Sequence, residues 1–182
     1  LLDTGFAIRG LLPWIDFKLA VIIHTSAAFL LLLLWLSIIF WHFTTDNWKH
    51  YLPTTSGLWP VMRFYAYGIF KNEKHPYSKR YLRKYNPLQA LTYSAVKLVL
   101  FPAIWVSGLF YLTYPFWSST PHELLVWVAN IHVLAAFGVF IFFMLHMYVL
   151  AMGGSFLHHV RPMLTGFDEV ELSPVEEAYF QE

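Results

Sequence analysis

The sequence predicts an all-α fold, an integral-membrane four-helix bundle whose first helix is largely absent from this sequence. Of the 182 residues, 58% are hydrophobic and only 13% are charged, which leaves too little polar surface for a soluble domain of this length. Three apolar segments reach the roughly 20 residues that a helix needs to cross a bilayer. Aromatic residues make up 20% of the chain, and Trp and Tyr gather near the ends of the apolar segments, as they do at membrane interfaces.

The predicted membrane spans belong to one domain that covers residues 1–182. The segment from Leu1 to Phe6 has the composition of the end of an apolar helix, so we expect a first helix that begins upstream of Leu1. Lys97 is the one charged residue within the three complete spans, and its long side chain can reach the membrane interface. Pro102 is expected to kink the same span. The complete spans cover residues 19–41, 90–114 and 124–152.

The polar segment 42–88 predicts the orientation of the chain in the membrane. It holds eight of the twelve basic residues, whereas the segment between the second and third complete spans holds none. Because basic loops stay on the cytoplasmic side, we expect this loop and the tail 153–182 to be cytoplasmic. The tail becomes acidic from Asp168 onward and is expected to be partly disordered. The eight basic residues are Lys49, Arg63, Lys71, Lys74, Lys79, Arg80, Arg83 and Lys84.

Composition also excludes several kinds of site. The chain has no cysteine, which excludes disulfides, c-type haem attachment and metal sites with cysteine ligands. A net charge of +1 gives no electrostatic reason to expect a nucleic-acid partner. A metal would therefore rest on histidine or oxygen ligands, and nine histidines are present.

Three of these histidines, His24, His132 and His146, lie inside predicted membrane spans. An ionisable side chain inside a membrane helix is costly and is therefore a functional hypothesis by default. A single such histidine is often only a hydrogen-bonding residue. Three at matching depths and on matching faces are harder to explain by chance.

The spacing of His132 and His146 suits two haems. The two residues are 14 positions apart, so at about 100° per residue they return to within about 40° of the same helix face, about 21 Å apart along the axis. This distance is too long for one metal centre and short enough for electron transfer between two. We therefore expect two haems between the helices, one near each side of the membrane.

His24 and His132 are expected to share the outer haem. Each lies in the first third of its span, and the two spans run in the same direction, so the imidazoles lie at similar depth. Two neutral imidazoles can take both axial positions of a haem iron, each with its Nδ1–H turned to a second acceptor. Small residues flank both histidines and allow a flat macrocycle to approach the backbone: Thr25 to Ala28, and Ala135 to Gly138.

His146 lies near the inner face and lacks an obvious partner in the sequence. We expect its partner at the start of the first helix, upstream of Leu1. His42 is an alternative within the chain, since it follows His24 by 18 residues and shares its face. It would stand about 27 Å from His24 along the axis, against about 21 Å for the other pair. These two axial distances differ by about one helical turn, so His42 would not lie at the same depth as His146.

The remaining histidines are expected to lie outside the membrane core. His50, His75 and His122 fall in predicted loops, where solvation is the simplest interpretation. His158 and His159 follow the last span at the cytoplasmic rim, where an interfacial role is expected.

Asn86 and Gln89 mark the start of the second complete span. Asn followed by Pro is typical of a helix N-cap with Pro at the first helical position. Amide side chains at a water-facing helix start can also bond to the oxygens of a quinone headgroup. A cap alone, and a cap combined with a quinone site, are equally compatible with these residues.

These histidines and their neighbours resemble the four-helix dihaem cytochrome b subunits of respiratory formate dehydrogenases, nickel–iron hydrogenases and thiosulfate reductases. The similarity covers nearly the whole chain, and its matches occur in the family's order. They are the first-helix end Leu2 to Gly5, the segment Ile23-His24-Thr25, the segment Lys84 to Gln89, the fourth-helix segments Asn130 to Gly138 and Leu145 to Tyr148, and the tail segment Arg161 to Glu169.

The resemblance implies an outer haem b held by His24 and His132, and an inner haem b held by His146 and a histidine of the first helix. It implies a menaquinone or ubiquinone site beside the inner haem, near Asn86, Gln89 and His146. It also implies a prokaryotic cytoplasmic membrane, an iron–sulfur or multihaem cytochrome subunit as partner, and a catalytic redox subunit.

The sequence therefore favours an electron-transfer subunit of a membrane oxidoreductase complex, which connects quinone with a partner through two b haems. A haem-free membrane anchor, or a transporter subunit with histidines as proton relays, is the alternative. The cytochrome b of bc-type complexes would need a second 14-residue histidine pair. The 18-residue gap between His24 and His42 argues against that class.

Overall fold

The computed structural model describes residues 1–78, 81, 83–117, 121–152, 156–167, 172 and 174–181. Throughout these residues the regular structure is helical and includes no strand. The elements are α1 (Leu2–Ile8), α2 (Phe17–Thr44), η1 (Asn47–Tyr51), α3 (Leu58–Ala66), η2 (Gly68–Lys71), α4 (Pro87–Ala95), η3 (Val96–Leu100), α5 (Phe101–Thr113), η4 (Tyr114–Phe116), α6 (His122–Met152), α7 (Phe156–Thr165) and α8 (Pro174–Tyr179).

Three helical stretches are long and apolar enough to cross a membrane, as the sequence predicts. Five of their six ends lie two or three residues beyond the predicted bounds, and the last stretch ends one residue before its predicted end. Most of their large apolar side chains are exposed, which suits helices surrounded by hydrocarbon. The protein is an integral-membrane helical bundle. The stretches are Phe17–Thr44, Pro87–Phe116 and His122–Ala151.

The chain forms two compact units. Unit 1 comprises residues 1–48 and 103–140, and unit 2 comprises residues 49–102 and 141–182. Each unit brings together segments that are far apart in the sequence, so each is described by itself.

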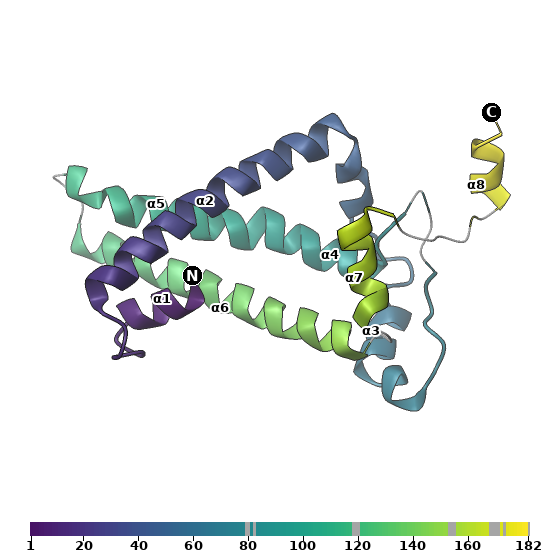
Figure 1. The fold of residues 1–182 in the computed structure, drawn as a ribbon, viewed down its shortest axis with the longest axis horizontal. Coiled ribbons are helices and arrows are strands. Elements are labelled where there is room, and N and C mark those ends of the chain that lie inside the picture. Colours follow the sequence, from purple (N-terminus) through teal and green to yellow (C-terminus); the bar gives the residue numbers. More distant parts are fainter. Residues whose placement is uncertain are drawn as a thin grey trace. The chain divides into compact units, whose positions relative to one another are not determined.

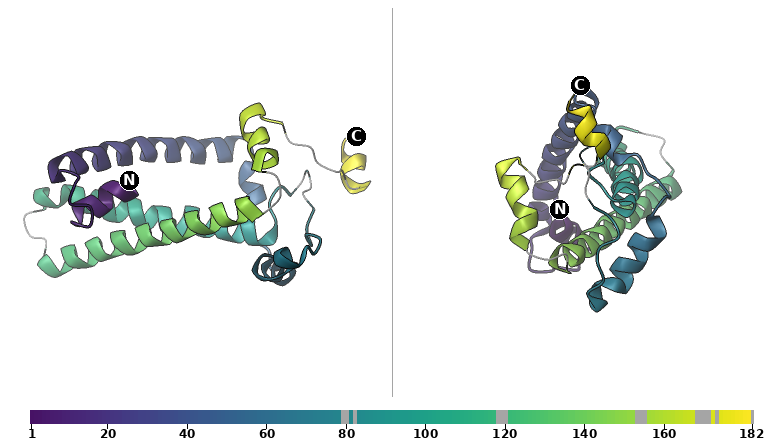
Figure 2. Two further views of the ribbon diagram at one scale, coloured as in Figure 1. Left: turned by 60° about the horizontal axis from the view of Figure 1, so that its bottom comes forward. Right: turned by 90° about the vertical axis from the view of Figure 1, so that its right-hand side faces the viewer.

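In unit 1, α1 packs against α2 (Figure 1). The side chain of Asp16 caps α2 by accepting a hydrogen bond of 2.9 Å from the backbone N–H of Leu19, which satisfies one of the free donors at the helix start. Ala7 of α1 and Ala20 of α2 are buried. The first half of α6 runs beside α5 (Figure 2). The helical segment expected at the N-terminus is therefore present as α1.

In unit 2, the segment predicted as a long loop contains three short helical elements, η1, α3 and η2. These helical elements were not predicted from the sequence. Val61 of α3 is 1% exposed, and apolar residues recur near it at helical spacing, which is the pattern of an amphipathic helix. Pro60 lies in the first turn of α3, where a missing N–H costs little.

The second membrane stretch begins with a reciprocal cap. The Asn86 side chain accepts a hydrogen bond of 2.8 Å from the backbone N–H of Gln89. The Gln89 side chain accepts one of 3.1 Å from the backbone N–H of Asn86. Pro87 occupies the first helical position. The predicted N-cap is confirmed, and it is a full capping box.

The irregularity expected at Pro102 takes the form of a π turn. Residues Val96–Leu100 form η3, and the N–H of Phe101 bonds to the carbonyl of Val96, five residues back. Proline lacks the N–H for a regular helical bond and crowds the carbonyl four residues earlier. The wider turn relieves this conflict while the helix continues.

Lys97 reaches an aromatic ring instead of open solvent. It lies in the π turn, and its Nζ stands 3.3 Å from the centre of the Tyr51 ring. A cation over an aromatic face is attracted by the ring's negative face. This contact holds η1 against η3 within unit 2.

One further expectation, that His50 and His122 lie in loops, is wrong. His122 is the first residue of α6, and His50 lies in η1, so neither is in a loop. The tail contains the helices α7 and α8. The backbone of His158 and His159 belongs to α7, but their side chains lie outside the described part of the chain, as does the acidic start at 168–171.

We predict that Asn86→Ala lowers the free energy of unfolding by about 1 kcal/mol, because the Gln89 N–H loses its acceptor. Asn86→Asp keeps an oxygen in the same place and should retain most of the stability. Thermal unfolding of the purified full chain in detergent measures both. Equal melting temperatures for the alanine variant and the parent would contradict the capping account.

Candidate functional site

His24 of α2 is held by α1 in unit 1. Its Nδ1 lies 3.0 Å from the Thr4 hydroxyl oxygen. That hydroxyl donates its own hydrogen to the carbonyl of Leu1 at 3.0 Å. Because the hydroxyl has one hydrogen, it accepts from the histidine, so His24 Nδ1 carries a proton. Thr4 is buried, which keeps water from competing for this bond.

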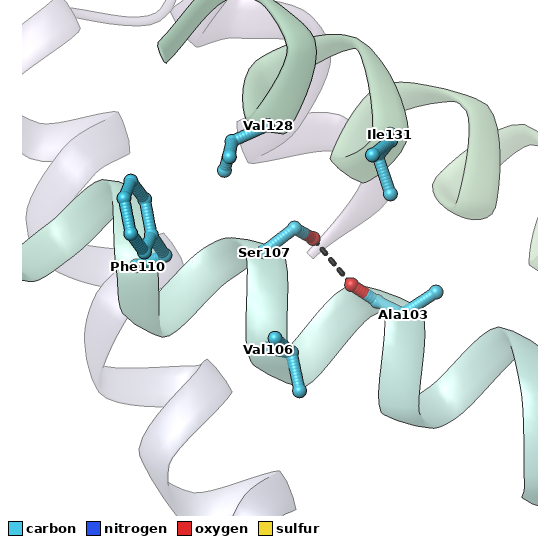
Figure 3. Close-up of a pocket in the computed structure, with 6 residues that line it drawn as sticks. All are labelled: Ala103, Val106, Ser107, Phe110, Val128 and Ile131. Atoms are coloured by element: carbon cyan, nitrogen blue, oxygen red, sulfur yellow. Dashed lines mark hydrogen bonds between the residues drawn. The ribbon is translucent and has the colours of Figure 1, made fainter. Parts of the chain in front are cut away.

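His132 of α6 is held by α5 in the same way. Its Nδ1 lies 3.1 Å from the Ser107 hydroxyl oxygen and 3.2 Å from the carbonyl oxygen of Ile104. The Ser107 hydroxyl donates to the carbonyl of Ala103 (Figure 3). A carbonyl oxygen only accepts, so His132 Nδ1 also carries a proton.

Both histidines therefore have the same tautomer. With Nδ1 protonated, the lone pair of a neutral imidazole lies on Nε2, and this nitrogen can bind a metal. The acceptors that we expected for the two Nδ1–H groups are present. Each is a hydroxyl group of a residue that precedes a glycine. Thr4 precedes Gly5, and Ser107 precedes Gly108.

The two glycines allow α1 and α5 to approach the imidazoles closely. A Cβ at Gly108 would stand 3.1 Å from Cε1 of His132, which is tighter than ordinary contact. A Cβ at Gly5 would stand 3.6 Å from Cε1 of His24, which is ordinary contact. Glycine at these positions lets a helix backbone lie against a flat ring.

The structure brings His24 and His132 together. Their ring centres are 6.3 Å apart, and their planes are inclined by 66°. An imidazole nitrogen binds a metal ion at about 2 Å, so two imidazoles on opposite sides of one ion have ring centres about 6 Å apart. The spacing fits one metal held between two histidines.

Two histidines are too few ligands for a bare metal ion, so they favour a metal that is already bound in a macrocycle. Among the described residues there is no group of three or more His, Cys, Asp or Glu side chains that could hold a metal ion. Two facing imidazoles supply the two axial ligands of a haem iron, whose other four ligands belong to the macrocycle. The residues therefore fit a haem.

An apolar pocket opens between α5 and α6 beside this pair (Figure 3). Ser107 is its polar member, and its hydroxyl is engaged by Ala103 and His132. Near it in the sequence, the indole N–H of Trp105 is buried with no acceptor in the described part of the chain. The pocket is lined by Ala103, Val106, Ser107, Phe110, Val128 and Ile131.

His146 lies in unit 2 among aromatic rings. Its ring centre is 5.8 Å from that of Phe142 and 6.4 Å from that of Tyr93. Tyr93 also contacts the Tyr51–Tyr85 pair, whose hydroxyl oxygens are 3.0 Å apart. Burial, together with the bond to Tyr85, raises the pKa of Tyr51. The Tyr51 phenol therefore stays protonated at neutral pH.

The other candidates are placed as follows. Asn86 and Gln89 lie in unit 2 at the start of α4, and Asn86 is 3% exposed. His42 lies in the last turn of α2, where its Nδ1 donates to the carbonyl of Ile38 at 2.7 Å. Sequence reasoning overlooked Ser107 and Gly108, although a hydroxyl residue before a glycine at the depth of His132 could have indicated them.

The family model for the prokaryotic cytochrome b561 matches residues 1–166. The chain belongs to this family. Membership makes it a membrane protein that binds haem b and transfers electrons, and it confirms the predicted family resemblance. Haem supplies an iron that can gain and lose one electron. The paired histidines are then the residues of this b561 chain that fit its two axial positions.

A curated relative points the same way. The chain is 29% identical over 155 residues to a protein of Escherichia coli (strain K12) described as "Putative cytochrome YdhU". The alignment covers 82% of this chain and 59% of the relative, so this chain spans about three fifths of that protein's length. No solved structure matches the chain significantly.

The two glycines of this b561 protein make a matched test. Gly108→Ala should displace the His132 ring by a few tenths of an ångström and shift the haem's midpoint potential, whereas Gly5→Ala should leave the potential near that of the parent. Redox titration of the purified protein measures both. Identical potentials for Gly108→Ala and the parent would contradict the close contact.

Proposed function

We propose that this chain is the membrane haem b subunit of a respiratory complex, and that it transfers electrons between the quinone pool and a partner redox subunit through two b haems. The facing pair of His24 and His132, with both Nδ1 atoms hydrogen-bonded, is the observation that carries this proposal.

The outer haem would take its axial ligands from Nε2 of His24 and Nε2 of His132. The hydroxyls of Thr4 and Ser107 hold the rings in place and make the imidazoles better donors to iron. Neither histidine needs to change its protonation during electron transfer. Their role is to hold the iron and to set its potential.

The inner haem would take one ligand from His146. Two observations support this role: the residue lies on α6 with His132, 14 positions further along, and two aromatic rings lie beside it. Phe142 and Tyr93 provide flat faces of the kind that line a macrocycle. The ligand opposite His146 is expected from the first helix of the fold.

A menaquinone or ubiquinone site near Asn86, Gln89 and His146 would complete the path. The capping box uses the amide oxygens of Asn86 and Gln89 as acceptors. A quinone carbonyl needs donors, and the NH₂ groups of these amides are donors. A cap and a quinone contact can therefore coexist in the same two side chains.

The partner would be an iron–sulfur or multihaem subunit that exchanges electrons with the outer haem, next to a catalytic redox subunit. We place the protein in the prokaryotic cytoplasmic membrane, with the segment 42–88 and the tail on the cytoplasmic side. The abundance of basic residues in that segment supports this orientation.

His24→Ala and His132→Ala should each remove one haem while a second haem remains. A reduced-minus-oxidised spectrum with haem quantification per chain measures this. His122→Ala, at the exposed start of α6, is the control and should keep the full haem content.

A purified protein without a b-type α-band would contradict the haem function and favour a haem-free anchor or transporter subunit. Full haem content in His24→Ala would contradict the ligand pair while leaving the function intact.

A further inference from the structure

A hydrogen-bonded pair, Tyr65 and His75, lies next to the capped start of α4 in unit 2. The chain folds back after α3, and Arg63 pairs with Glu73 at 3.0 Å across the fold-back. The backbone N–H of Glu73 also bonds to the carbonyl of Gly68 at 3.1 Å. These contacts return His75 to the side of α3.

The pair continues into the buried cap of α4. Nε2 of His75 lies 3.2 Å from the Tyr65 hydroxyl oxygen. The Nδ2 amide of Asn86 donates to the same hydroxyl at 3.5 Å. His75 is exposed, Tyr65 is half-buried and Asn86 is 3% exposed. The bonds therefore lead from solvent to a buried polar helix start.

His75 can keep hydrogen-bond partners in each of its protonation states. The carbonyl of Tyr77 lies 2.8 Å from His75 Nδ1, and the N–H of Tyr77 lies 3.1 Å from the same atom. The backbone thus offers an acceptor when Nδ1 carries a hydrogen and a donor when it does not. The Tyr65 hydroxyl can likewise donate to Nε2 or accept from it.

The imidazole is also held in place. Its ring centre lies 4.7 Å from that of Phe64 and 5.5 Å from that of Tyr65, both in edge-to-face contact. A proton relay needs this combination of a fixed ring, two usable tautomers and access to water.

We propose that Tyr65 and His75 carry protons between the quinone site at the start of α4 and the aqueous phase. This inference rests on the proposed quinone function. It assigns the proton transfer that accompanies quinone chemistry to two residues that take no part in the proposed electron transfer.

A quinol gives up two electrons, which would pass one at a time to haem b as the electron acceptor, and two protons. For each proton, the quinol O–H transfers its proton to the Tyr65 oxygen as the Tyr65 hydroxyl proton moves to Nε2 of His75. The resulting imidazolium releases a proton to water. Quinone reduction follows the same steps in reverse.

Burial raises the pKa of Tyr65. The phenol therefore stays protonated at neutral pH and passes protons by exchange instead of acting as a phenolate base. Arg63 and Glu73, which flank the pair in the chain, are joined to each other in an ion pair.

The test measures haem reduction by duroquinol in stopped-flow, with membranes that contain the full complex. His75→Ala and Tyr65→Phe should slow it by about tenfold or more, as loss of a positioned proton carrier does. Haem content and reduction by dithionite should not change. Added imidazole should restore the rate of His75→Ala, because that position is open to solvent, and should not restore Tyr65→Phe.

Tyr67→Phe is the matched control. Tyr67 is 50% exposed and its ring lies under Lys71, so its loss should leave the rate unchanged. Parent rates in both relay variants would overturn the relay. A slow His75→Ala variant that imidazole does not rescue, or one that loses haem, would show a structural role and would also overturn it. If duroquinol fails to reduce the haem of the parent protein, the quinone function itself is wrong.

Discussion

The constraint on which unit 1 depends is that two imidazole N–H groups inside a membrane need acceptors. Hydrocarbon provides none, and an unpaired donor there costs several kcal/mol. Thr4 and Ser107 meet this need because each hydroxyl gives its own hydrogen to a carbonyl of its helix and accepts from a histidine. Both rings therefore carry their free lone pair on Nε2, the atom that can bind a metal. The glycine after each hydroxyl residue makes the approach possible.

In unit 2 the chain passes from a polar segment into an apolar helix, and the backbone N–H groups at the start of that helix need acceptors. The capping box of Asn86 and Gln89 satisfies the first backbone donors, and the π turn adapts the helix to Pro102. The Asn86 side chain, which holds the backbone here, also bonds to Tyr65, and Tyr65 bonds to His75. The structural and the proposed chemical roles of this helix start therefore share the same atoms.

Much of this could be predicted from the sequence. The three spans, the cap at Asn86 and the pairing depth of His24 and His132 follow from hydropathy, turn chemistry and helical spacing. The helix α3 was missed because the basic residues of the segment 42–88 dominate its composition, although Val61 lies on an apolar face. Ser107 was missed because a single hydroxyl residue in an apolar helix does not indicate a hydrogen-bond partner, and the sequence does not show that His132 lies opposite it. His75 was taken for a solvated residue, and its contacts arise from the fold-back after α3.

Electron paramagnetic resonance of the oxidised purified protein tests the central claim most directly, because it reports the axial ligands of the iron. Two imidazoles on one iron give low-spin ferric haem, and planes inclined by 66° predict a strongly anisotropic low-spin signal from the outer haem. In His132→Ala this signal and one haem per chain should be lost, while the signal of the inner haem remains. A high-spin signal in the parent protein, or a low-spin signal that survives in His132→Ala with full haem content, would contradict the account.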